Sequence, residues 1–197
     1  VSTANIESFD KVYAVFSVPY LFTSEKAYEA FISNPEVLDK LSVNAKADGF
    51  TAMAAYTAGT RNFYSKTPIK SVADLQGKKF RVQAGPTNVA MMNAFGAAAT
   101  PMSFGDENNE LALTDQKHGE VCKYFTYDGH QMCPDIVVGS KVFLDKLSDS
   151  DRKAFEDAAK AAQEAEFAAW HESVQKAKDQ ATKMGVEFIN VDVNEFR

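Results

Sequence analysis

The sequence predicts an α/β fold of two lobes that share one long C-terminal helix. Residues 77–88, GKKFRVQAGPTN, have the pattern of a strand that ends at a Gly-Pro loop and continues into a helix, the unit from which open α/β sheets are built. Between residues 149 and 184, small and apolar residues recur every three or four positions, as on one face of a helix. At about 1.5 Å per residue this helix is roughly 50 Å long. It exceeds a compact lobe, so we expect it to span two.

Capping residues, glycines and prolines set the boundaries of the predicted elements. These elements are a loop-flanked buried segment at 12–22, helices at 23–32 and 35–49, β structure at 49–64, a helical turn at 71–77, a strand at 79–84, a helix at 88–96, the long helix and a strand at 185–193. The helix caps are Thr23, Asn34 before Pro35, Thr87 or Asn88, and Ser148 with Asp151, and the stops are Gly49, Gly96 and Gly185. A coiled coil is the alternative for the long helix, but its alanine-rich stripe is unlike a leucine heptad.

Composition places the chain among ordinary globular proteins. Its 197 residues can form one large domain or two small lobes, and 45% are hydrophobic and 24% charged. A net charge of -6 gives no reason to expect binding to nucleic acid or to an anionic membrane surface. No apolar run approaches the roughly 18 residues that span a bilayer, so we expect a peripheral protein rather than a membrane-inserted one.

Motifs for catalysis and cofactor binding are missing from the sequence. It has no G-x-G-x-x-G, no G-x-x-x-x-G-K-[ST], no H-E-x-x-H and no G-x-S-x-G. The histidines His118, His130 and His171 are widely spaced, which favours structural or surface roles over a metal site. We therefore expect neither an enzyme nor a bound cofactor or metal.

Two cysteines, Cys122 and Cys133, lie eleven positions apart. In an oxidising compartment they could form a disulfide, whereas in the cytosol they would be two reduced thiols. Redox catalysis is disfavoured because there is no C-x-x-C.

Charged residues in apolar surroundings are the candidates for ligand binding. Taken alone, Arg61 and Arg81 each suit a surface position or an internal salt bridge. Arg81, however, precedes a Gly-Pro loop at a strand end, where its planar guanidinium can donate two hydrogen bonds to a carboxylate. Residues 107–110, ENNE, add amides that can donate to and accept from hydroxyl groups.

Segments throughout the chain resemble the solute-binding proteins of tripartite ATP-independent periplasmic (TRAP) transporters. They are STANIESFDKVYAVFSVPYLF, GTRNFYSKTPIKSVADLQGKKFRV, GAAATPMSFG, ENNELAL and DIVVGSKVFLDKLSDSDRKAF. The resemblance implies an α/β, two-lobed architecture like that of periplasmic binding proteins, with a long C-terminal helix spanning both lobes. It also implies a periplasmic receptor that closes on an organic acid and delivers it to TRAP membrane permease subunits.

The resemblance also implies roles for particular residues. Arg81 would form the salt bridge to the ligand carboxylate, and Arg61, Asn108 and Phe104 would contribute to the same site. The implied division of the chain is lobe I at 1–58, lobe II with the carboxylate site at 59–133, a return to lobe I and the start of the long helix at 134–173, and the end of that helix with a strand in lobe II at 174–197.

Compared with the family, the chain lacks further βα units before STAN, and Gly105 joins Asp106 where the family has a helix and a strand. We therefore expect the true polypeptide to contain additional segments. For the ligand, a uronate or aldonate suits the two arginines and the amides at least as well as a C4-dicarboxylate does, and ENNE favours the sugar acid. A secreted enzyme and a non-binding interaction module are the alternatives from other classes.

Overall fold

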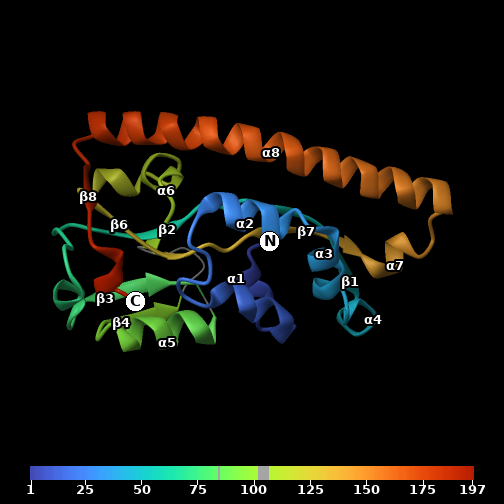
Figure 1. Cartoon of the computed structure of the whole chain (residues 1–197), viewed down its shortest axis with the longest axis horizontal. Coiled ribbons are helices and arrows are strands. Elements are labelled where there is room, and N and C mark those ends of the chain that lie inside the picture. Colours follow the sequence, from blue (N-terminus) through green and yellow to red (C-terminus); the bar gives the residue numbers. More distant parts are fainter. Residues whose placement is uncertain (84, 102–106) are drawn as a thin grey trace.

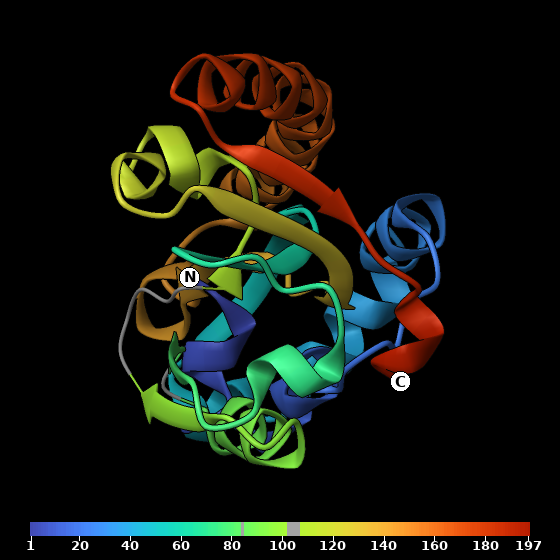
Figure 2. The ribbon, with the colours of Figure 1, turned by 90° about the vertical axis from the view of Figure 1, so that its left-hand side faces the viewer.

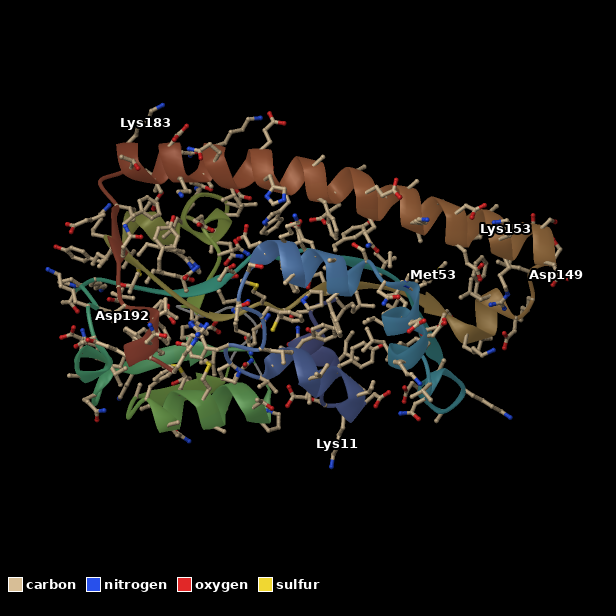
Figure 3. The ribbon with its side chains drawn as sticks, in the orientation of Figure 1. Lys11, Met53, Asp149, Lys153, Lys183 and Asp192 are labelled. Atoms are coloured by element: carbon tan, nitrogen blue, oxygen red, sulfur yellow. The ribbon has the colours of Figure 1, made fainter. Side chains whose placement is uncertain are left out.

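One helix extends along nearly the whole length of the molecule. The computed structural model describes residues 1–83, 85–101 and 107–197, and in it α8 (Asp149–Lys183) spans the long axis (Figure 1). Ser148 caps this helix by accepting a hydrogen bond from the Asp151 backbone N–H at 3.2 Å. Gly185, at φ +82°, adopts the left-handed conformation that lets the chain turn away. The predicted long helix and both its boundaries are confirmed, and charged residues such as Lys183 point outward from it (Figure 3).

Eight strands form three sheets within the described residues. β1 (Phe50–Tyr56) pairs with β7 (Asp135–Ser140) in an antiparallel sheet. The four-stranded sheet has the order β5 (Glu107–Asn108), β2 (Arg61–Ser65), β6 (Tyr124–Gln131), β8 (Glu187–Asn190). β8 runs parallel to β6, and Figure 2 shows the two side by side beneath α8.

The predicted strand, loop and helix around Arg81 are present. β3 (Lys79–Val82) leads through a loop into α5 (Pro86–Ala94), and β4 (Ala98–Pro101) returns parallel to β3. The other helical segments are α1 (Thr3–Ile6), η1 (Lys11–Ser17), α2 (Glu25–Ile32), α3 (Pro35–Leu41), α4 (Ala45–Asp48), η2 (Val72–Leu75), α6 (Leu111–Thr114), η3 (His118–Glu120), α7 (Lys141–Leu144) and η4 (Val193–Glu195).

Three hydrophobic clusters fill the interior. One packs η1, α2 and α3 against β1 and β7, with Tyr28 and Ile136 fully buried. A second joins β2, β3 and α5, and a third joins β2, β6, α6 and α8. The helix α8 contacts the first cluster through Phe167 and the third through Ala181, so it links both ends of the molecule. The lobe boundaries drawn from the sequence stay a prediction.

Two of the predicted caps are wrong by one to three residues. Ser24, not Thr23, caps α2 by accepting a hydrogen bond from the Ala27 backbone N–H at 3.2 Å. The N-cap of α5 is Gly85 rather than Thr87 or Asn88. Pro86 explains the second difference, because proline is preset for the first helical position and needs no partner for an N–H. Asn88 is thereby free to be buried inside the first helical turn.

The possible disulfide between Cys122 and Cys133 is not formed in this structure, where both cysteines are free thiols. Cys122 packs in the third cluster and Cys133 in the first, and the eight-residue strand β6 lies between them. At about 3.3 Å per residue, β6 separates its two ends by roughly 26 Å. A disulfide requires Cα atoms within about 7 Å.

We predict that both thiols react in the unfolded chain. Without reductant, a thiol reagent added under denaturing conditions should modify two sulfurs per molecule, as counted by intact mass. Cys133 should react slowly in the folded protein, because burial raises the pKa of its thiol to about 12. If the unfolded, unreduced chain is not modified, its two cysteines do form a disulfide.

No helix among the described residues is both long and apolar enough to cross a membrane.

Candidate functional site

A polar cavity of about 420 Å³ opens where the chain crosses from the β1–β7 sheet to the four-stranded sheet. Its volume lies in the usual range for small-molecule sites. The residues that line it come from α1, β2, β5, α6, β7, α8 and the loops beside them: Ser2, Asn5, Ala58, Arg61, Gln83, Asn108, Asn109, Leu111, Ala112, Asp115, Gln116, Cys133, Asp135 and Trp170. The cavity wall is therefore built from segments that lie far apart in the sequence.

Arg61 and Asn108 meet at the cavity because their strands are neighbours. Arg61 is the first residue of β2. Asn108 lies on the adjacent strand β5, where it pairs in register with Asn62 of β2. The Arg61 Nη1 group donates a hydrogen bond to Asn108 Oδ1 at 3.3 Å. The sheet thus places a guanidinium and an amide side by side in the cavity wall.

Most of the Arg61 guanidinium is already engaged by Glu107. Nε donates to Glu107 Oε2 at 2.5 Å, and Nη2 donates to Oε1 at 3.1 Å and to the Glu107 carbonyl oxygen at 2.6 Å. With the bond to Asn108, four of the five N–H groups of the guanidinium have acceptors. Arg61 can therefore offer a ligand a single N–H, and not a bidentate pair.

Glu107 belongs to a buried row of alternating charges. Its Oε2 lies 3.3 Å from His130 Nε2, and His130 Nδ1 lies 2.7 Å from Asp128 Oδ2. Asp128 in turn accepts the Phe63 backbone N–H at 2.9 Å, and the His130 ring stacks on Phe63 at 4.5 Å. Every charged member of the row is at most 5% exposed. We call Arg61, Glu107, His130 and Asp128 the buried charge row.

The electrostatics of the row keep it charged at neutral pH. Burial alone would lower the pKa of His130, but the carboxylates of Asp128 and Glu107 outweigh burial and raise the pKa to about 9. Burial opposes ionisation of Glu107, yet Arg61 and His130 hold the pKa of its carboxyl below the ordinary value. The two positive and two negative charges of the row then compensate one another, whereas an unpaired buried charge would carry a large desolvation cost.

Arg81 is the less engaged of the two arginines. It lies in register with Thr100 on β4, and its Nε atom is buried without a hydrogen-bond partner in the described part of the chain. Arg81 is not itself among the lining residues. It lies two residues before Gln83, which does line the cavity. Arg81 is therefore close in sequence to the cavity wall, and its Nε can still donate a hydrogen bond.

The sequence-predicted residues thus have different positions relative to the cavity. Arg61 and Asn108 are in its wall, Arg81 is on the neighbouring strand, and Phe104 lies outside the described residues. His130 is the structural histidine that spacing suggested, but its charge partners were not anticipated. Asp128 and His130, two apart on β6, share a face of the strand, and this alternation is the signal that could have found them.

The raised pKa of His130 predicts how stability depends on pH. Its stabilisation is fully present below about pH 6.5, the unfolded pKa, and is lost as pH rises through about 9. The free energy of unfolding should fall by up to about 3 kcal/mol over this window. The free energy of unfolding measured in urea should not fall over this pH window in His130→Gln. In His171→Gln, changed at an exposed site, it should fall as in wild type. Equal slopes in His130→Gln and wild type would contradict the charge row.

Comparison with known proteins places the whole chain in one family. Residues 1–196 match the family model described as bacterial extracellular solute-binding protein, family 7. YiiZ, an uncharacterised protein of Salmonella typhimurium, is 40% identical over 100% of this chain and 65% of its own length. The 2,3-diketo-L-gulonate-binding periplasmic protein YiaO of Escherichia coli is 29% identical over 94% of this chain and 60% of its own length. The chain spans less than two thirds of these relatives.

Solved structures agree in fold. A TRAP periplasmic solute-binding protein from Anaerococcus prevotii, with bound D-glucuronate, is 42% identical and superimposes with a TM-score of 0.96 over 100% of this chain and 68% of that one. One from Pseudomonas putida F1, also with bound D-glucuronate, is 31% identical with a TM-score of 0.94, covering 100% and 69%.

These matches confirm the predicted fold and the predicted family resemblance. The chain belongs to the bacterial extracellular solute-binding proteins of family 7.

Proposed function

We propose that this protein is a periplasmic receptor that binds a uronate-type sugar acid in the cavity beside Arg61 and Arg81 and delivers it to a TRAP membrane permease. The observation that carries the proposal is the composition of the cavity wall, where a guanidinium lies among amides and carboxylates from several helices and strands. Structures of similar proteins with bound D-glucuronate and galacturonate support this ligand class.

The ligand carboxylate is assigned to Arg81. Because Glu107 already occupies the bidentate face of Arg61, the proposal gives the carboxylate to Arg81, whose Nε is buried without a partner in the described part of the chain. Arg61 adds its remaining N–H. Asn108, Asn109 and Gln83 supply amide groups that both donate to and accept from sugar hydroxyls.

Two carboxylates in the cavity wall favour a hydroxyl-rich monoacid over a dicarboxylate. Asp115 and Asp135 both line the cavity. Sugar hydroxyls can donate hydrogen bonds to these side chains, whereas the second carboxylate of a C4-dicarboxylate would meet like charge. C4-dicarboxylates therefore rank below uronates and aldonates in this proposal, although relatives named as C4-dicarboxylate-binding proteins exist.

Binding and lobe closure form one event in this mechanism. A partly buried arginine without a partner is costly, and an arriving carboxylate relieves that cost. Closure of the lobes then excludes water from the cavity and strengthens the new ion pair. The closed, loaded protein is the form that a permease would recognise, with no cofactor required. Phe104 stays a predicted contact of the same ligand.

Trp170 provides a direct assay for the ligand. It is the only tryptophan of the chain and it lines the cavity. D-glucuronate and D-galacturonate should change its fluorescence at saturating micromolar concentration, while D-glucose, which lacks the carboxylate, and succinate, which lacks the hydroxyls, should not. A response to succinate alone would replace the sugar acid with a dicarboxylate as ligand.

Arg81→Ala should weaken binding of D-glucuronate by about 10²- to 10⁴-fold, since losing one partner of a buried ion pair costs about 3 to 5 kcal/mol. Arg81→Lys should recover little, because an ammonium cannot reproduce the bidentate geometry. Arg152→Ala removes the same charge from an exposed ion pair with Asp145 and should leave the affinity measured by calorimetry unchanged. Wild-type affinity in Arg81→Ala would refute the assignment.

A further inference from the structure

The middle of α8 carries three side chains that face the end of β1 and the crossing segment, residues 57–60, which connects β1 to β2. Gln163, Glu166 and Trp170 are spaced by three and four residues, so they lie on one face of the helix. Phe167, four residues after Gln163, and Ala181, about five turns after it, lie on the same side of the helix and pack into two of the apolar clusters. We call Gln163, Glu166 and Trp170 the α8 clamp.

Two members of the clamp bind backbone N–H groups. Ala55 N–H donates to Gln163 Oε1 at 3.1 Å, and Thr57 N–H donates to Glu166 Oε2 at 3.0 Å. Ala55 and Thr57 are two residues apart in extended chain, so their N–H groups point to the same edge of β1. Helix side chains therefore take the place of a neighbouring strand on this edge of β1.

The third member fits against a glycine. Gly59 has φ +65°, and a Cβ added there would lie 3.0 Å from Cζ2 and Nε1 of Trp170. The indole ring is thus packed directly on the backbone of the crossing segment. Trp170 also lines the cavity, so one side chain touches both the crossing segment and the ligand space.

The crossing segment is held from the other side as well. Gly59 N–H donates to Thr57 Oγ1 at 3.1 Å, and the Ala58 carbonyl oxygen accepts from Asn109 Nδ2 at 2.9 Å. Asn109 follows β5 and lines the cavity. The segment therefore connects α8, the cavity wall and both sheets, and any movement of one lobe relative to the other must change its backbone angles.

We propose that the α8 clamp holds the crossing segment between the lobes and thereby controls how readily the lobes open around a bound ligand. Gln163, Glu166 and Trp170 are positioning residues in this device. The part that concerns ligand release rests on the proposed function, whereas the hold on the crossing segment does not.

The surroundings of Glu166 show which feature of its side chain the clamp needs. Burial, with Asp135 of β7 and Glu29 of α2 nearby, raises the pKa of the Glu166 carboxyl to about 7, against the opposing effects of the Thr57 N–H and His171. The carboxyl oxygen can accept the Thr57 N–H at 3.0 Å whether or not the group is ionised, so the contact needs an acceptor oxygen at this place. Glutamine keeps such an oxygen and alanine does not.

Amide hydrogen exchange in the ligand-free protein tests the hold directly. Glu166→Ala should accelerate exchange of the Thr57 amide by at least about tenfold, because its acceptor is gone, while Glu166→Gln should retain protection. The Phe63 amide, bonded to Asp128, is the internal reference. Glu164→Ala changes an exposed neighbour on α8 and is the control variant. Unchanged Thr57 protection in Glu166→Ala would overturn the proposal.

Stopped-flow fluorescence with D-glucuronate tests the effect on ligand release. Dissociation should be about tenfold faster in Glu166→Ala and close to wild type in Glu166→Gln and Glu164→Ala. Equal dissociation rates in wild type and the three variants would show that the α8 clamp does not control opening of the lobes. If wild type does not bind D-glucuronate, the proposed ligand is wrong, and the Thr57 exchange rates still decide whether the clamp exists.

Discussion

Pairing of buried charge is the constraint on which the arrangement of the site depends. Arg61 on β2, Glu107 on β5, and Asp128 and His130 on β6 come from three adjacent strands, and each is stable inside the protein only because an opposite charge lies beside it. The row therefore requires these strands to be neighbours in the observed register. It also fixes the Arg61 guanidinium at the cavity wall.

Committing Arg61 to Glu107 has a consequence for recognition. A guanidinium that already forms two bonds to a carboxylate is a rigid wall element with one N–H to spare, whereas the Nε of Arg81 has no partner among the described residues. The two arginines are therefore not equivalent, although the sequence offers them as a similar pair. In the proposed function, the remaining specificity comes from amides and acidic groups, which suit hydroxyls better than a second negative charge.

The long helix adds a mechanical link to this site. Its apolar residues pack into clusters at both ends of the molecule, and its polar residues Gln163 and Glu166 accept hydrogen bonds from the backbone of β1 and of the crossing segment. An uncovered strand edge would otherwise expose unpaired N–H groups. The same covering places Trp170 between the crossing segment and the cavity, so packing of the helix and access to the ligand space are connected.

Local signals were enough for much of the fold. The cap at Ser148, the stop at Gly185 and the strand, loop and helix around Arg81 follow from short-range chemistry that a linear pattern carries. The partner of Arg61, the contact of His130 with Glu107 and the contact of Glu166 with Thr57 depend on groups 46, 23 and 109 positions away. The sequence by itself determined the long helix, the strand, loop and helix around Arg81, and the candidate arginines. Only the tertiary structure decided which charges neutralise one another, because pairing depends on strand order and register that no local pattern encodes.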